Sequence, residues 1–111
     1  VEESQLEKMN ATADELPIEQ SEAKVFDIEM NSSIVDSYPP MIAESPVVYF
    51  CELSDEVILK NDTTIPVILD IKEIYLDDKR IIDRDALSVE FTPIAHIAGS
   101  EYALSGERVL I

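Results

Sequence analysis

Two apolar runs with a repeat of two residues dominate the pattern along the chain. In the first, between Pro46 and Leu59, one parity is apolar, with β-branched and aromatic residues prominent: Val47, Tyr49, Cys51 and Leu53. Since successive side chains of a strand point to opposite faces, this predicts a strand buried on one face and, near its start, on both. The second run, from Thr63 to Leu76, places one parity on a single face: Thr63, Ile65, Val67, Leu69 and Ile71.

A polar turn signal separates the two runs, at Lys60, Asn61 and Asp62. Because these residue types favour turns, the runs are most simply the two antiparallel strands of one hairpin with a short polar loop. After Ile71 the apolar positions change parity, since Ile74 and Leu76 are the next apolar residues. A one-residue slip inside an apolar run indicates a β-bulge, so we expect a long, bent strand of the kind found in barrels.

The chain before the hairpin predicts little regular structure. A short helical pattern ends near Thr12, and one further helical turn is expected at residues 22–26. From Ile18 to Pro40 the sequence is acidic and weakly patterned, which is typical of an irregular segment that wraps a core. Residues 41–46 then predict a tight connection into the first strand.

The chain after the hairpin predicts short elements and one loop. Ile81 and Ile82 indicate a brief return strand, and Asp83 is placed to cap a helical turn through Leu87. Residues 91–102 mix proline, histidine and glycine. We expect this stretch to be a loop of the kind in which sites are often found.

Length, composition and cysteine content place limits on the class of protein. The 111 residues, 46% of them hydrophobic, fit one small domain with a buried core. Cys51 has no partner cysteine in the chain, which excludes a disulfide framework and makes a reducing compartment, the cytoplasm, the expectation. No apolar run approaches the roughly 20 residues that a membrane helix needs, and no secretory leader pattern is present.

The charge of the chain is strongly negative and unevenly distributed. There are 24 acidic and 8 basic residues, giving a net charge of −16. Up to Leu59, 14 acidic residues face only Lys8 and Lys24. Because such a surface repels phosphate backbones and anionic lipid, we expect neither nucleic acid nor membrane as a partner.

Local motifs for chemistry are sparse. Gly99 and Gly106 are the only glycines, so the chain has no glycine-rich phosphate loop. One histidine and one cysteine cannot form a structural zinc site, and the acidic residues at 77–85 lack the glycine and terminal glutamate of a calcium loop. A catalytic Cys51–His96 pair stays open, although a cysteine inside an apolar strand is more often an inert core residue.

Four segments carry a resemblance to a known family through their order and spacing. They are Met9–Ala13, Ile42–Val47 leading into Cys51–Leu53, the bent strand ending at Asp77–Asp78, and Ile94–Glu107. Together they resemble the second half of flavin reductase-like FMN-binding split-barrel proteins, the group that includes flavoredoxin and the small component of nitrilotriacetate monooxygenase. Two positions differ from that pattern, because Leu69 and Ala98 stand where relatives often carry glycine.

The resemblance implies a mainly β fold with short helices, in which residues 1–111 are the C-terminal portion of one flavin reductase-like split-barrel domain. It implies an FMN-dependent oxidoreductase, usually dimeric, in which NAD(P)H donates hydride to the flavin and the reduced flavin is used or passed to a partner monooxygenase. Most FMN contacts would come from the half that precedes Val1. Within this chain, the resemblance makes His96, Gly99 and Tyr102 the candidate cofactor-binding residues. His96 would help place the reduced pyridine ring or its phosphate, Gly99 would allow close approach, and Tyr102 would pack beside it.

Alternatives remain open for the histidine and for the whole chain. His96 is also interpretable as a structural residue satisfied by a backbone carbonyl. The chain is also interpretable as a half-barrel without flavin, a structural or interaction module that acts through self-association. Whether or not the chain binds flavin, half of a barrel leaves apolar edges that another polypeptide must cover, so we expect a homodimer or larger assembly. The residues expected near or behind that surface are Val47, Tyr49, Val67 and Leu69.

Overall fold

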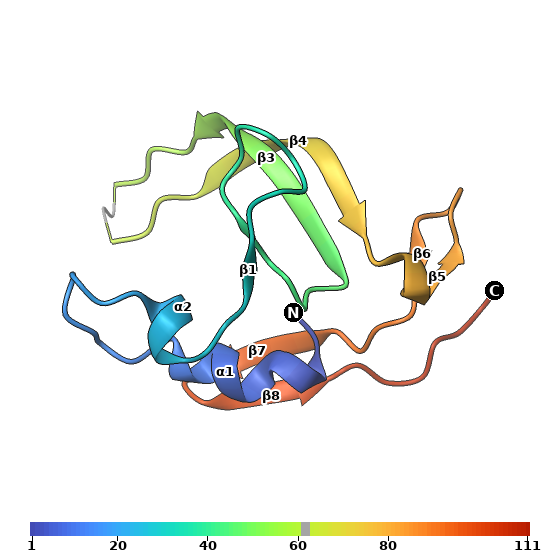
Figure 1. The fold of residues 1–111 in the computed structure, drawn as a ribbon, viewed down its shortest axis with the longest axis horizontal. Coiled ribbons are helices and arrows are strands. Elements are labelled where there is room, and N and C mark those ends of the chain that lie inside the picture. The colour runs from blue at the N-terminus through green and yellow to red at the C-terminus, as the bar shows by residue number, and fades with distance from the viewer. Residues whose placement is uncertain (61–62) are drawn as a thin grey trace.

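The structure, a computed structural model, describes residues 1–60 and 63–111 (Figure 1). The short helices are η1 (Glu3–Gln5), α1 (Leu6–Ala11), α2 (Glu22–Val25) and η2 (Asp78–Arg80). The strands are β1 (Met30–Asn31), β2 (Met41–Ile42), β3 (Val47–Glu56), β4 (Val67–Leu76), β5 (Ile81–Asp83), β6 (Ser88–Val89), β7 (Ile94–Ala98) and β8 (Glu101–Leu104). Within the described residues they form four antiparallel two-stranded ribbons, β1–β2, β3–β4, β5–β6 and β7–β8. The fold is therefore mainly β, as predicted, and its sheets do not close into a barrel.

The β3–β4 ribbon confirms the predicted antiparallel hairpin and its bulge. Phe50 pairs with Glu73, but the next residue, Cys51, pairs with Ile71, so that Lys72 is the extra residue. This shift lies directly after Ile71, where the apolar parity changes in the sequence. A second shift, between Leu53 and Asp55, was not expected from the pattern. The two irregularities bend the long strands because a bulge increases local twist.

The connection between β3 and β4 is longer than the short polar loop that the sequence predicts. The ladder ends at Glu56 and resumes at Val67, so the predicted strand ends at residues 57–59 and 63–66 lie in the connection. Pro66 has no N–H to donate to a ladder, and its carbonyl accepts from the Val57 amide at 2.8 Å. Two of the predicted turn residues, at positions 61 and 62, lie outside the described residues.

The expected burial of one hairpin face is wrong for most of its length. Only Phe50 in the ribbon is buried, and Leu53, on the face expected to be covered, is 57% exposed. Large apolar side chains are exposed along both strands: Tyr49, Leu53, Val67, Ile68, Leu69, Ile71 and Ile74. The reason is that β3 and β4 contact mainly each other, so the other described elements cover little of these side chains.

The small core lies where the hairpin meets the segment before it. Met41 and Phe50 are buried there, and Pro46 is also fully buried, whereas the third buried hydrophobic residue, Val89, lies in β6. The ring of Tyr38 meets that of Phe50 edge to face, with centroids 5.5 Å apart. This core fixes the start of β3 against the irregular acidic segment, which, as predicted, contains little regular structure apart from α2 and the short β1–β2 ribbon.

The region after β4 includes one confirmed element and one correction. The return strand predicted at Ile81 and Ile82 is β5. The helical turn predicted after Asp83 is wrong: residues 84–87 form a tight turn between β5 and β6. The Asp83 carboxylate accepts from the amides of Asp85 and Ala86 at 3.0 and 3.1 Å. Leu87 then adopts a left-handed φ of 52°, which cannot continue a helix.

The candidate-site stretch is a hairpin rather than the predicted loop. Residues 94–104 form β7 and β8, joined by Gly99 and Ser100. In Figure 1, α1 lies along this hairpin, on the opposite side of the molecule from β3–β4. Among the described residues, no helix has the length and apolar character needed to cross a membrane.

Candidate functional site

The β7–β8 hairpin brings together all three candidate residues. His96 and Tyr102 are directly paired across the two strands, and a register shift follows at Ile97 before Ala98 pairs with Glu101. Gly99 opens the two-residue loop with a φ of 53°, a left-handed conformation that glycine adopts without steric cost. A Cβ added there would meet no heavy atom within 4 Å, so the tip of the hairpin faces open space.

The His96 ring is held on one face and at one nitrogen. It stacks on Tyr102 with ring centroids 4.8 Å apart and an interplanar angle of 24°. Its Nε2 lies 2.8 Å from the carbonyl oxygen of Gly99. Because a carbonyl only accepts, Nε2 carries the hydrogen in this contact and Nδ1 is the acceptor of the neutral ring. The backbone-carbonyl contact expected for a structural histidine is therefore present, and the cofactor role of His96, Gly99 and Tyr102 stays a prediction.

Helix α1 supports the hairpin through one hydrogen bond. The Tyr102 hydroxyl donates to Oδ1 of Asn10 at 3.0 Å, in a part-buried position. The tyrosine is thus fixed at its hydroxyl by the helix and at its ring by His96. No local pattern predicts this support, since the two residues are far apart along the chain.

The structure does not support a Cys51–His96 pair. Cys51 is half-buried in β3, and His96 lies in β7, in a separate ribbon. The ring nitrogen of His96 contacts Gly99 instead. Cys51 therefore lacks, in the described residues, the neighbouring base that would activate its thiol.

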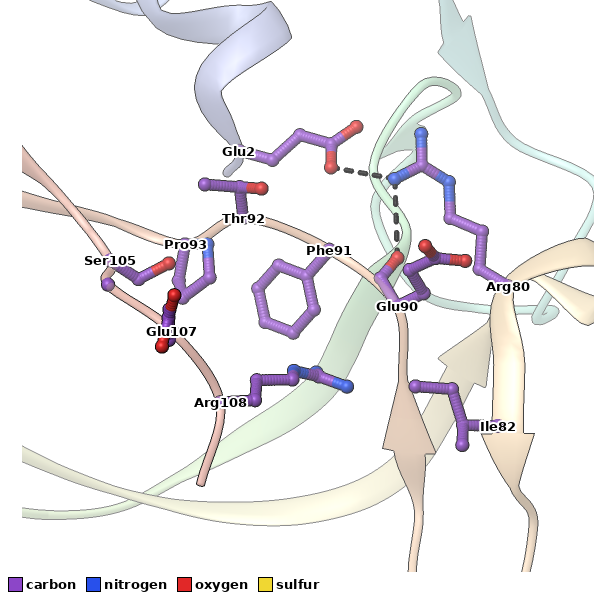
Figure 2. Close-up of a pocket in the computed structure, with 11 residues that line it drawn as sticks. Glu2, Arg80, Ile82, Glu90, Phe91, Thr92, Pro93, Ser105, Glu107 and Arg108 are labelled. Carbon is purple, nitrogen blue, oxygen red and sulfur yellow. Dashed lines mark hydrogen bonds and ion pairs between the residues drawn. The ribbon is translucent and has the colours of Figure 1, made fainter. Parts of the chain in front are cut away.

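A second candidate site is a cavity of about 740 Å³ between the β5–β6 ribbon, residues 91–93 and the C-terminal segment 105–108 (Figure 2). Two of the chain's three arginines, Arg80 and Arg108, line it, and we call it the Arg80–Arg108 cleft. Figure 2 shows the Phe91 ring between the Glu2–Arg80 pair and the Arg108 side chain. The cleft therefore combines an aromatic face with two guanidinium groups.

Arg80 forms ion pairs with two carboxylates. Its Nη1 lies 2.6 Å from Oε2 of Glu2, whose side chain is 8% exposed, and its Nε lies 3.7 Å from Asp77. The hydrogen bond from Arg80 holds the pKa of the Glu2 carboxyl below its ordinary value, although burial opposes this. The same hydrogen bond raises the pKa of Arg80. Both groups are therefore charged at neutral pH, and the charge of Arg80 is already neutralised.

Arg108 is in a different situation. Its Nη2 donates to the carbonyl oxygen of Val89, a residue that is 2% exposed. In the part of the chain that the structure describes, Arg108 forms no ion pair. The cleft therefore holds one guanidinium that forms no ion pair with a carboxylate.

No pattern in the sequence predicts this cleft, for a physical reason. Its charged residues lie near the two ends of the chain and at positions 80 and 90, and no local motif connects them. Charged side chains such as Glu2 are also normally exposed, so its burial could not be anticipated. The one signal in the sequence that could have indicated this site is the small number of arginines, three in the whole chain.

The described residues fit a contact with FMN but not a complete FMN site. The His96–Tyr102 stack and the open space at Gly99 suit the approach of a planar ring. A phosphate needs cations or free amides, and Arg80 is already paired with two carboxylates. The cleft therefore offers a phosphate one guanidinium without an ion pair, Arg108, beside the carboxylates of Glu90 and Glu107.

Comparison with known proteins supports the fold. No family model matches the chain, and neither does any curated protein. A solved structure of the 2-nitrobenzoate 2-nitroreductase NbaA from Pseudomonas fluorescens is similar over 100% of this chain and 55% of its own, with a TM-score of 0.75 and 24% identity. A protein assigned as a flavin reductase with a split barrel domain, from Shewanella frigidimarina NCIMB 400, is similar over 100% of this chain and 56% of its own, with a TM-score of 0.78 and 22% identity. The split-barrel fold expected from the sequence is confirmed, and the chain spans little more than half the length of these structures.

Proposed function

We propose that this chain is the C-terminal portion of an FMN-dependent split-barrel oxidoreductase in which NAD(P)H reduces the flavin. The observation that carries the proposal is the likeness over the whole chain to a split-barrel flavin reductase structure, of which the chain spans 56%. The uncovered apolar side chains of β3 and β4 support it, because further strands of a barrel would cover them. Such a half-domain needs the rest of the barrel for a full cofactor site.

The residues of the β7–β8 hairpin would form one wall of that site. FMN, when bound, accepts a hydride equivalent and passes electrons on. Tyr102 fixes the plane of the His96 ring, and the Gly99 carbonyl fixes its tautomer. The carbon that donates hydride needs no acid or base, so His96 should act on nicotinamide binding more than on the chemical step.

The same proposal includes an assembly. The apolar side chains exposed on β3 and β4 would be covered in a homodimer or larger assembly, and a partner monooxygenase would be the acceptor of reduced flavin. A cytoplasmic location also stays a prediction, based on the single cysteine.

The direct test uses the complete protein, this chain together with the rest of the proposed barrel, and asks whether it carries flavin. We expect the visible absorption of oxidised flavin, release of FMN on denaturation, and loss of that absorption when NADH or NADPH is added without oxygen. The identity of the released flavin distinguishes FMN from FAD. A colourless protein that takes up no added FMN would contradict the proposal.

One observation favours the alternative of a half-barrel without flavin. Arg80 is neutralised by Glu2 and Asp77, and the chain carries a net charge of −16, so binding of the FMN phosphate is disfavoured. In that case the β3–β4 surface would still drive self-association. A stable oligomer that remains colourless after incubation with FMN would identify this second function.

A further inference from the structure

The Arg80–Arg108 cleft has the size and lining of a small-molecule site. Its volume of about 740 Å³ lies within the roughly 300–1,000 Å³ typical of ligand pockets. Apolar surface comes from Ile82, Phe91 and Pro93, and polar groups come from both arginines and from Ser105. Figure 2 shows that the side chains of Phe91 and Arg108 both extend into the cleft.

Arg108 is the one arginine of the cleft that is free to bind an anion. A guanidinium has five N–H donors, and one of them goes to the Val89 carbonyl. The chain has 24 acidic residues, yet none forms an ion pair with Arg108 among the described residues. Arg80 differs, because Glu2 and Asp77 already neutralise it.

The surrounding carboxylates limit the charge of the ligand. Glu90 and Glu107 also line the cleft, and they would repel an anion with two negative charges. Arg108 offers one guanidinium without an ion pair, and its planar fork matches a carboxylate through two parallel hydrogen bonds. A singly charged carboxylate is therefore favoured over a phosphate.

The shape of the lining indicates what the carboxylate is attached to. Phe91 lines the cleft together with Arg108, and a flat ligand ring can stack on the Phe91 ring or meet it at the edge. We propose that the Arg80–Arg108 cleft binds a small aromatic carboxylate, with the carboxylate on Arg108 and the ring against Phe91. This site goes beyond the proposed function and needs no flavin.

The test measures benzoate binding to the purified full chain by calorimetric titration, with no flavin or nicotinamide added. Arg108→Gln removes the charge and the fork, and we expect it to weaken benzoate binding by at least about tenfold. Arg84→Gln is the matched control, because Arg84 pairs with the exposed Asp78 at 3.2 Å and does not line the cleft. Its benzoate affinity should stay within about twofold of the unaltered chain.

Two further ligands test the proposal on the unaltered chain, without any substitution. Benzamide has the same ring without the charge, and phenyl phosphate has a second negative charge, so each should bind the unaltered chain at least about tenfold more weakly than benzoate. Absence of benzoate binding, equal binding of benzamide, or an unchanged affinity of a folded Arg108→Gln protein would overturn the proposal. Tighter binding of phenyl phosphate would overturn the choice of carboxylate. Since no flavin is present, these results are separate from the test of the proposed function.

Discussion

Tyr102 and Asn10 are joined by a hydrogen bond of 3.0 Å across 92 positions of the sequence. The same tyrosine stacks on His96, so helix α1 contacts its hydroxyl and the candidate-site histidine contacts its ring. The position of the His96 ring therefore depends on a residue near the start of the chain. This arrangement makes the β7–β8 hairpin part of the folded unit rather than a free loop.

Tyr102→Phe should destabilise the chain by about 1 kcal/mol, because it removes the hydroxyl but keeps the ring stack. Asn10→Ala should cost a similar amount, and the double variant should cost less than the sum. Urea unfolding measures all three free energies. Tyr75→Phe is the control, since its hydroxyl has no hydrogen bond in the described structure, and full additivity would mean that Asn10 and Tyr102 do not interact.

Glu2→Gln should destabilise the chain near neutral pH, because it breaks the ion pair with Arg80. The folded-state pKa of Glu2 lies below its ordinary value of 4.5, so its contribution is complete above that pH. As the pH falls through the lower folded pKa, the contribution is lost. The difference in unfolding free energy between the two proteins should therefore shrink in acid. Asp78→Asn, in the exposed pair with Arg84, is the control, and its unfolding free energy should differ little from that of the unaltered chain at any pH. If the difference for Glu2→Gln grows in acid, the predicted direction of the pH dependence is wrong.

Leu53→Glu and Leu69→Glu should weaken self-association, because these cross-strand partners are 57% and 50% exposed on the β3–β4 ribbon. A buried carboxylate at an apolar interface is costly, so we expect the dissociation constant to rise by at least about tenfold. Sedimentation equilibrium measures it. Ile18→Glu, at a fully exposed residue outside the ribbon, serves as the control. A stable monomer of the unaltered chain at micromolar concentration would remove the basis of this prediction.

His96→Gln should raise the apparent KM for NADH or NADPH more than it lowers kcat, in a complete, flavin-loaded protein. The reason is that the imidazole would position the nicotinamide without taking part in proton transfer. Stopped-flow measurement of flavin reduction separates the two effects. If affinity and rate are unchanged for both donors, His96 is structural, as its contact with the Gly99 carbonyl would also allow.

Elements encoded by neighbouring residues could be predicted from the sequence. The β3–β4 pairing and the bulge after Ile71 follow from a local repeat of two, and His96, Gly99 and Tyr102 lie together because a tight hairpin joins them. Proline, histidine and glycine in residues 91–102 predict a loop, but Pro93 lies before β7 and Gly99 lies in the turn, so neither interrupts a strand.

Features formed by distant residues could not be predicted. The Glu2–Arg80 pair and the Tyr102–Asn10 bond join residues 78 and 92 positions apart. The exposure of β3 and β4 was also beyond the sequence, because an apolar pattern predicts that a face is covered but not which polypeptide covers it.

The uncovered β3–β4 hairpin has a consequence for the time course of folding. Hairpins form within roughly 1–10 μs, whereas docking of separate polypeptides takes milliseconds to minutes. The apolar side chains of this hairpin therefore exist in water long before a partner reaches them. During that interval the acidic residues at the end of β3, Glu52, Asp55 and Glu56, and the bulge at Lys72 would disfavour the flat edge-to-edge stacking that begins aggregation.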